Sequence, residues 1–121
     1  MSSLFDRLGG AAAVDAAVDR FYDRVLADDR IRHFFDGVDM PRQRQHQKAF
    51  LTYAFGGAGQ YGGGALRESH APLVARGLND EHFDAVVEDL GLTLKELGVP
   101  DDLIGEVTLV TETVREDLLG R

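Results

Sequence analysis

Apolar residues recur at helical spacing along most of the chain, and this periodicity restricts the fold more than any other feature of the sequence. Four apolar side chains of the first long segment are separated by four, three and four positions, which places them on one helix face: Val14, Val18, Phe21 and Val25. Residues 83–97 and 103–118 repeat this spacing. Residues 107–114 are rich in β-branched side chains, so a strand is the alternative to a helix there. No other run in the sequence could pair with such a strand. The sequence therefore predicts an all-α fold.

Proline, glycine and asparagine predict where the helices begin and end. Pro41 suits the first turn of a helix, because its missing N–H costs nothing there. That helix should end at the stretch 56–64, whose six glycines predict a loop. Asn79 or Asp80 is expected to cap the next helix, and Pro100 to start the last helix.

Charge is distributed unevenly along the chain. The net charge is −8, yet residues 40–67 contain no acidic side chain and carry +4. The basic residues of this segment are Arg42, Arg44, Lys48 and Arg67. Such a segment indicates a local anionic ligand, with chance in a polar helix followed by a glycine loop as the alternative. Three aspartates of the first long helix are expected to form a solvated stripe: Asp15, Asp19 and Asp23.

Composition excludes several classes of protein. An acidic chain repels nucleic acid and anionic lipid, so we expect neither nucleic acid nor a membrane as a partner. The same charge argues against self-association, so we expect a monomer. Cysteine is absent, which excludes disulfides and thiolate metal sites. The sequence shows no signal peptide and no apolar run near the ~20 residues of a membrane span. We therefore expect a cytoplasmic protein with one domain spanning residues 1–121.

The sequence contains one nucleotide-binding motif out of context, and it lacks the common histidine motifs for a metal site. Residues 57–62 match G-x-G-x-x-G, but a helix and not a strand precedes them, so no dinucleotide site is expected. None of the four histidines lies three positions after a glutamate, and no two share a helical turn, so a compact metal site is not expected. His33 and His82 are expected at the surface. His46 and His70 remain, and they could act together only through a large cofactor.

The neighbours of these two histidines are compatible with a pocket. His46 shares a helix face with Gln43 and Gln47, at spacings of three and four. His70 has apolar residues beside it, Leu66 and Leu73. For each histidine, a hydrogen-bonded position in the core is the alternative.

The chain also resembles a known family over nearly its whole length. The stretches that carry the resemblance are LFDRLGG (4–10), RFYDRVL (20–26), HFF (33–35), QRQHQKAFLTYAFGG (43–57), RESH (67–70), LNDEHFD (78–84) and LGVP (97–100). Their order and spacing together resemble the group I truncated haemoglobins, in particular the cyanobacterial type. The resemblance implies a shortened globin fold, with two helices stacked on two others around one haem.

The resemblance also implies a role for individual residues. His70 resembles the proximal iron ligand, and His46 resembles the distal histidine that binds iron from the other face in cyanobacterial members. Tyr22, Gln43 and Gln47 resemble the hydrogen-bond donors that stabilise a diatomic ligand. The other residues implied at the haem are Phe34, Phe35, Arg42, Leu51, Tyr53, Leu66, Arg67, Leu73, Phe83, Val86 and Val87. Arg42, together with Arg44 and Arg67, would pair with the haem carboxylates.

The functions implied are those of a haem protein that binds O2, NO and CO from a bis-histidine resting state. The reaction is O2 binding or nitric oxide dioxygenation, and the latter needs a separate reductase because this short chain has no flavin domain. Some members bond haem covalently through a histidine in the last helix, but no histidine follows His82, so we expect non-covalent haem b. A bis-histidine electron-transfer protein and a helical interaction module without cofactor are the alternatives.

Overall fold

The protein is described by a computed structural model that places residues 3–56 and 71–119. Its elements are α1 (Leu4–Leu8), α2 (Gly10–Leu26), the 3-10 helix η1 (Arg32–Phe35), α3 (Met40–Ala54), α5 (Asp80–Glu96), α6 (Asp101–Glu112) and α7 (Arg115–Leu118). The described ranges contain helices and no strand, which confirms the all-α prediction. No helix in these ranges is both long enough and apolar enough to cross a membrane.

The helix starts follow the local sequence signals. Pro41 lies in the first turn of α3, as predicted, and the Asp39 side chain caps this helix by accepting from the Arg42 backbone N–H at 3.2 Å. Asn79 caps α5, also as predicted. Its side chain accepts from the backbone N–H of Glu81, and its own N–H donates to Nδ1 of His82. His82 therefore stabilises a helix end.

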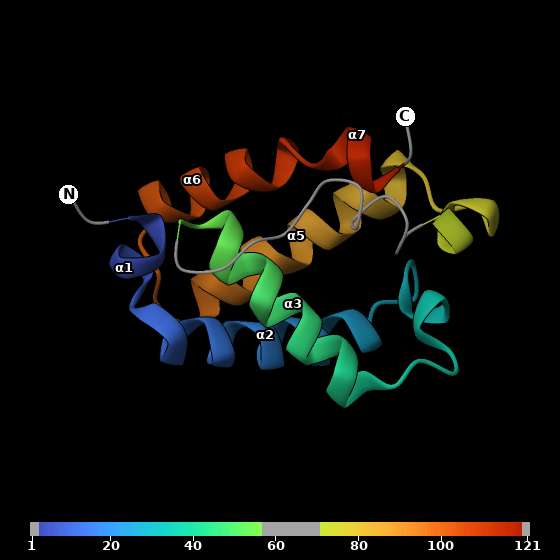
Figure 1. Ribbon diagram of the computed structural model, residues 1–121, viewed down its shortest axis with the longest axis horizontal. Helices are drawn as coiled ribbons and strands as arrows, with labels where there is room; N and C mark the ends of the chain where they lie inside the picture. The colour runs from blue at the N-terminus through green and yellow to red at the C-terminus, as the bar shows by residue number, and fades with distance from the viewer. Residues whose placement is uncertain (1–2, 57–70, 120–121) are drawn as a thin grey trace.

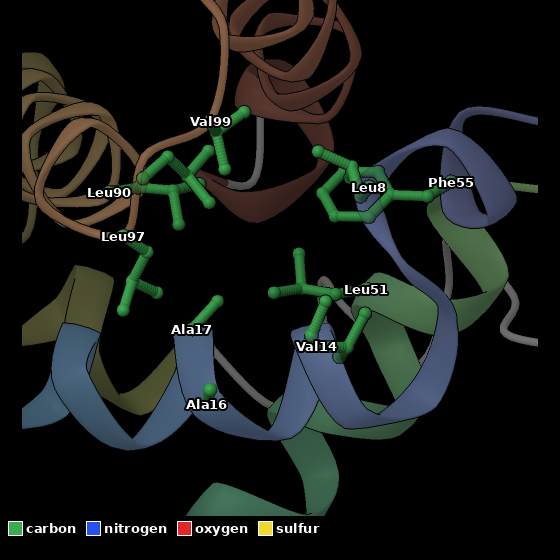
Figure 2. A pocket seen from close by; sticks show the side chains of 11 residues that line it. Leu8, Val14, Ala16, Ala17, Leu51, Phe55, Leu90, Leu97 and Val99 are labelled. Atoms are coloured by element: carbon green, nitrogen blue, oxygen red, sulfur yellow. The ribbon is translucent and has the colours of Figure 1, made fainter.

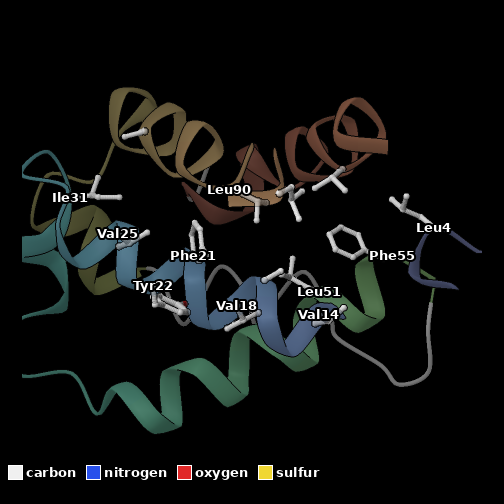
Figure 3. Packing of buried hydrophobic residues seen from close by; sticks show 14 of the residues in the cluster. Leu4, Val14, Val18, Phe21, Tyr22, Val25, Ile31, Leu51, Phe55 and Leu90 are labelled. Carbon is white, nitrogen blue, oxygen red and sulfur yellow. The ribbon is translucent and has the colours of Figure 1, made fainter. Parts of the chain in front are cut away.

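Helix α2 packs against both α3 and α5, and Figure 1 shows α3 crossing in front of α2. The face predicted from periodicity is buried, because Val14, Val18, Phe21 and Val25 are each at most 3% exposed. Figure 3 shows this face meeting Leu51 of α3 and Leu90 of α5. Each such side chain contributes about 1.5–3 kcal/mol on burial, so this contact fixes how α3 and α5 flank α2.

The last helical segment is interrupted, although the sequence predicts it as one helix. α6 ends at Glu112 and α7 begins at Arg115. Before the break, the Thr111 hydroxyl donates to the carbonyl of Val107 at 2.8 Å, and the Thr113 hydroxyl donates to that of Val110 at 2.6 Å. Such bonds compete with the helical ladder and favour a bend. The periodicity does not reveal this interruption, because α7 continues the same apolar spacing.

Candidate functional site

A cavity of about 290 Å³ opens between α2, α3 and α5, and residues of η1, α6 and α7 complete its wall. Many residues predicted from the sequence line it: Tyr22, Phe34, Phe35, Gln43, His46, Gln47, Leu51, Leu73, Phe83 and Val86. The sequence did not assign the other lining residues to a site: Phe21, Ile31, Val38, Phe50, Pro72, Leu78, Leu90, Thr111, Val114 and Leu118. Several of these belong to predicted apolar faces, but periodicity cannot separate a cavity wall from a filled core.

Three predicted residues lie away from this lining. Tyr53 is 44% exposed and lies seven residues beyond His46, which is about 10 Å along the axis of α3. Val87 is half-buried on α5, next to the lining residue Val86, and Arg42 is exposed in the first turn of α3. The predicted residues Leu66, Arg67 and His70 lie outside the described part of the chain.

The polar groups of the cavity come mainly from α2 and α3. Tyr22 is 2% exposed on α2, and its hydroxyl accepts a hydrogen bond of 3.1 Å from Nε2 of Gln43. Gln47 and His46 line the cavity on the same side of α3, and His46 is exposed to solvent there. The Tyr22 ring packs edge-on against Phe35, with centroids 5.7 Å apart. The buried hydroxyl of Tyr22, two amides and an imidazole thus border a mainly apolar space.

Two basic residues of the acid-free segment form ion pairs with carboxylates of α2. Arg44 lies 3.4 Å from a carboxylate oxygen of Asp19 and 3.3 Å from one of Asp23, while Lys48 lies 3.7 Å from both Asp15 and Asp19. The three carboxylates are exposed, as a solvated stripe should be, but they also pair with α3. The local positive charge therefore serves helix packing in part.

A buried acidic residue that the sequence did not single out precedes the lining residue Leu90 on α5. Asp89 of α5 is 3% exposed, and its Oδ2 has no hydrogen-bond partner among the described residues. Burial and the neighbouring carboxylate of Asp28 raise the pKa of Asp89 to about 7. Hydrogen bonds from Arg30, at 2.8 Å for Nη2, lower the pKa of Asp28. Asp89, next to the lining residue Leu90, therefore releases its proton only near neutral pH.

A second cavity of about 210 Å³ lies at the α1 end of the molecule (Figure 2). Its lining residues are all apolar: Leu8, Ala13, Val14, Ala16, Ala17, Leu51, Phe55, Leu90, Leu94, Leu97 and Val99. It shares Leu51 and Leu90 with the large cavity, so these two side chains stand between the two spaces. Apolar cavities of this kind hold small apolar molecules better than water.

The large cavity has the chemistry that a flat, apolar, metal-bearing cofactor requires. Phe34, Phe35 and Phe83 supply aromatic surface for the faces of a ring system. His46 supplies an imidazole that could bind a metal at the ring centre, and Tyr22 supplies a hydroxyl for a small ligand. These residues fit haem.

Comparison with known proteins places this geometry in a family. The model of the bacterial-like globins matches residues 3–119. The chain is 66% identical over 111 residues to a group 1 truncated haemoglobin of Synechocystis, which covers 91% of this chain and 90% of the relative. It is 46% identical over 119 residues to the group 1 truncated haemoglobin of Tetrahymena thermophila, which covers 98% of this chain and 96% of the relative.

Solved structures agree with the sequence relatives. The crystal structure of the 2/2 haemoglobin from a Synechococcus species, in the cyanomet state with covalently attached haem, matches with a TM-score of 0.94 and 52% identity, covering 99% of this chain and all of the other. Truncated haemoglobin from Tetrahymena pyriformis in its Fe(III) form matches with a TM-score of 0.90 and 44% identity over 99% of this chain and all of the other. The chain therefore belongs to the bacterial-like globin family, as a group 1 truncated haemoglobin with the 2/2 fold.

Proposed function

We propose that this globin binds haem b in the large cavity, with His70 and His46 as its two axial ligands, and that it binds O2, NO and CO there. The observation that carries the proposal is the buried Tyr22 hydroxyl, joined to Gln43 at 3.1 Å on the same cavity wall as His46. When bound, haem would supply an iron centre to which histidine nitrogens and diatomic ligands could bind. The apolar residues of the cavity lining would limit the access of water to that centre.

The donors on α2 and α3 suit a ligand with partial negative charge, such as O2. Gln43 donates to Tyr22, and a hydroxyl that accepts one hydrogen bond becomes a better donor of the next. Gln47 adds a second amide from the same helix face. Each such bond is worth about 1–3 kcal/mol when its partners are shielded from water.

His46 is proposed to compete with external ligands for one axial position. It lies on α3 at the edge of the cavity, where its side chain is also exposed to solvent. An imidazole in this position can leave the cavity for water without a buried polar group losing its partner. Ligand binding is then limited by the release of His46.

The reaction that we propose is nitric oxide dioxygenation, in which NO, O2 and one electron give nitrate. The electron comes from a separate reductase. The buried Tyr22 and the half-buried Gln43 support this choice, because these donors favour retention of O2 until NO arrives.

The haem is proposed to be held without a covalent bond. The wall on the side of α6 and α7 consists of Thr111, Val114 and Leu118, and no histidine follows His82 in the sequence. Under this proposal the chain would differ from the Synechococcus protein, whose haem is covalently attached. Extraction with acid and organic solvent should remove the haem completely, and haem retained on the polypeptide would contradict the proposal.

The variant His46→Leu tests the assignment of the axial ligand. We expect the ferric spectrum to change from low-spin to high-spin, and CO to bind the reduced protein faster in stopped flow. Gln45→Leu is the matched control, because Gln45 is exposed on α3 and outside the cavity lining. Unchanged spectra and rates in His46→Leu would show that His46 is not an axial ligand. Rapid redox cycling without CO or O2 binding in the unaltered protein would instead indicate electron transfer.

A further inference from the structure

We infer that Arg44 is a positioning residue for Tyr22, and that its guanidinium, held over the tyrosine ring by two carboxylates of α2, strengthens the Tyr22 hydroxyl as a donor to O2. The inference rests on the proposed function, because it concerns the ligand that Tyr22 faces. It assigns a ligand-selecting role to a charge that lies outside the cavity.

The contacts of Arg44 fix its guanidinium above the ring. Its Cζ lies 5.6 Å from the ring centroid of Tyr22. Nη1 donates to the backbone carbonyl of Asp19 at 2.9 Å, and Nη2 lies 3.3 Å from a carboxylate oxygen of Asp23. Asp19 and Asp23 are three residues before and one residue after Tyr22 on the same helix. The guanidinium cannot leave the ring without losing these contacts as well.

The ring beneath Arg44 is itself held from other sides. Tyr22 packs edge-on against Phe21 and Phe35, with centroid distances of 5.0 Å and 5.7 Å, and Gln43 donates to its hydroxyl. In Figure 3, Phe21 points from α2 towards α5, whereas Tyr22 lies on the side of α2 nearer α3. A cation on the face of a phenol ring favours negative charge on its oxygen, and burial limits the screening of this effect.

A purely structural role is the competing explanation, since Arg44 also fastens α3 to α2. Lys48 separates the two explanations. It lies one turn further along α3, pairs with Asp15 and Asp19 of α2, and its side chain is 20% exposed against 22% for Arg44. In the described part of the chain, Lys48 has no aromatic ring beneath it. It fastens the same helices without acting on Tyr22.

The first test compares Arg44→Gln with Lys48→Gln in the haem-loaded protein. For Arg44→Gln we expect the O2 dissociation rate to rise about three- to tenfold, with CO dissociation changed by less than about twofold, because a partly buried cation–π contact has that magnitude. The C–O stretching frequency of the CO form should move to higher wavenumber. Lys48→Gln should change neither the ratio of the two rates nor this frequency. Equal effects of the two variants, or no effect of Arg44→Gln, would overturn the inference.

The second test does not depend on a bound ligand. A double-mutant cycle of Arg44→Gln and Tyr22→Leu, read from urea unfolding of the full chain, should show a coupling of about two- to fivefold in the unfolding equilibrium constant. Lys48→Gln with Tyr22→Leu should be additive. Additivity in both cycles would contradict the Arg44–Tyr22 contact. If the chain failed to take up haem while the cycle of Arg44→Gln and Tyr22→Leu showed coupling, the proposed function would be contradicted and the Arg44–Tyr22 contact would be confirmed.

Discussion

The side-chain amide of Gln43 donates a hydrogen bond of 3.1 Å to the hydroxyl of Tyr22, which joins α3 to α2 at the wall of the large cavity. Tyr22 is buried and Gln43 is half-buried, so water can replace this bond only poorly. The two residues should therefore act as a unit on any ligand in the cavity.

Tyr22→Phe keeps the ring and removes the hydroxyl. We expect O2 to dissociate about tenfold faster or more, because one shielded hydrogen bond of about 1–3 kcal/mol is lost. Gln43→Leu should have a smaller effect in the same direction, and the double variant should resemble Tyr22→Phe alone. Stopped-flow displacement of O2 by CO measures these rates. Strictly additive effects of the two substitutions would contradict their action as a unit.

Asp89 predicts an unusual pH dependence of stability. Burial raises its pKa to about 7, above the usual value of 3.8, so the folded chain holds a proton that the unfolded chain releases between these values. This contribution is fully present below about pH 4 and is lost as the pH rises to 7, at a slope of at most about 1.4 kcal/mol per pH unit. The asparagine of Asp89→Asn does not titrate, so this variant should lose less stability than the unaltered protein as the pH rises from about 4 to 7.

Urea unfolding of both proteins at pH 5, 6, 7 and 8 measures this difference. Glu81→Gln is the matched control, because Glu81 is an exposed carboxylate on the same helix. It should follow the unaltered protein. Parallel stability curves for Asp89→Asn and the unaltered protein would show that Asp89 does not hold the proton.

Arg115 is predicted to hold the α7 side of the cavity in place. Its guanidinium lies 3.0 Å from Asp80, 2.6 Å from Asp84 and 2.8 Å from Glu112, and its Cζ lies 4.4 Å above the ring centroid of Phe83. Arg115→Gln should free α7 from the start of α5, and the loss of about 1–2 kcal/mol should accelerate haem loss about five- to thirtyfold.

Transfer of haem to a second apoprotein in excess measures that rate. Arg7→Gln is a suitable control, because Arg7 also binds a carboxylate at 2.8 Å, that of Glu106, but unlike Arg115 it lies over no aromatic ring of the cavity lining among the described residues. Equal rates of haem loss for the two variants would contradict a specific role of Arg115 at the cavity.

Periodicity and caps predicted much of the fold from the sequence. Val14, Val18, Phe21 and Val25 were assigned to one buried face because apolar spacing reports burial directly. Asn79 was recognised because few residue types cap a helix. These signals are local, so no knowledge of the partner helices is needed to interpret them.

The features that the sequence did not reveal depend on which helices meet. Arg44 and Lys48 suggested an anionic ligand, but their partners Asp19 and Asp15 come from a helix about thirty residues earlier in the chain. Asp89 resembled any polar residue of α5, because its burial results from packing against another segment. The lining of the cavity was likewise found largely through the family resemblance, which includes packing information that a single sequence lacks.

Absorption spectra of the purified full chain with one equivalent of haem test the central claim most directly. The spectra are recorded for the ferric protein, the ferrous protein and the ferrous protein with CO. We expect stoichiometric haem uptake, low-spin bands in the ferric and ferrous forms without ligand, and conversion to a CO spectrum as His46 is displaced. High-spin ferric bands without ligand would contradict the axial role of His46, and absence of a Soret band would contradict haem binding itself.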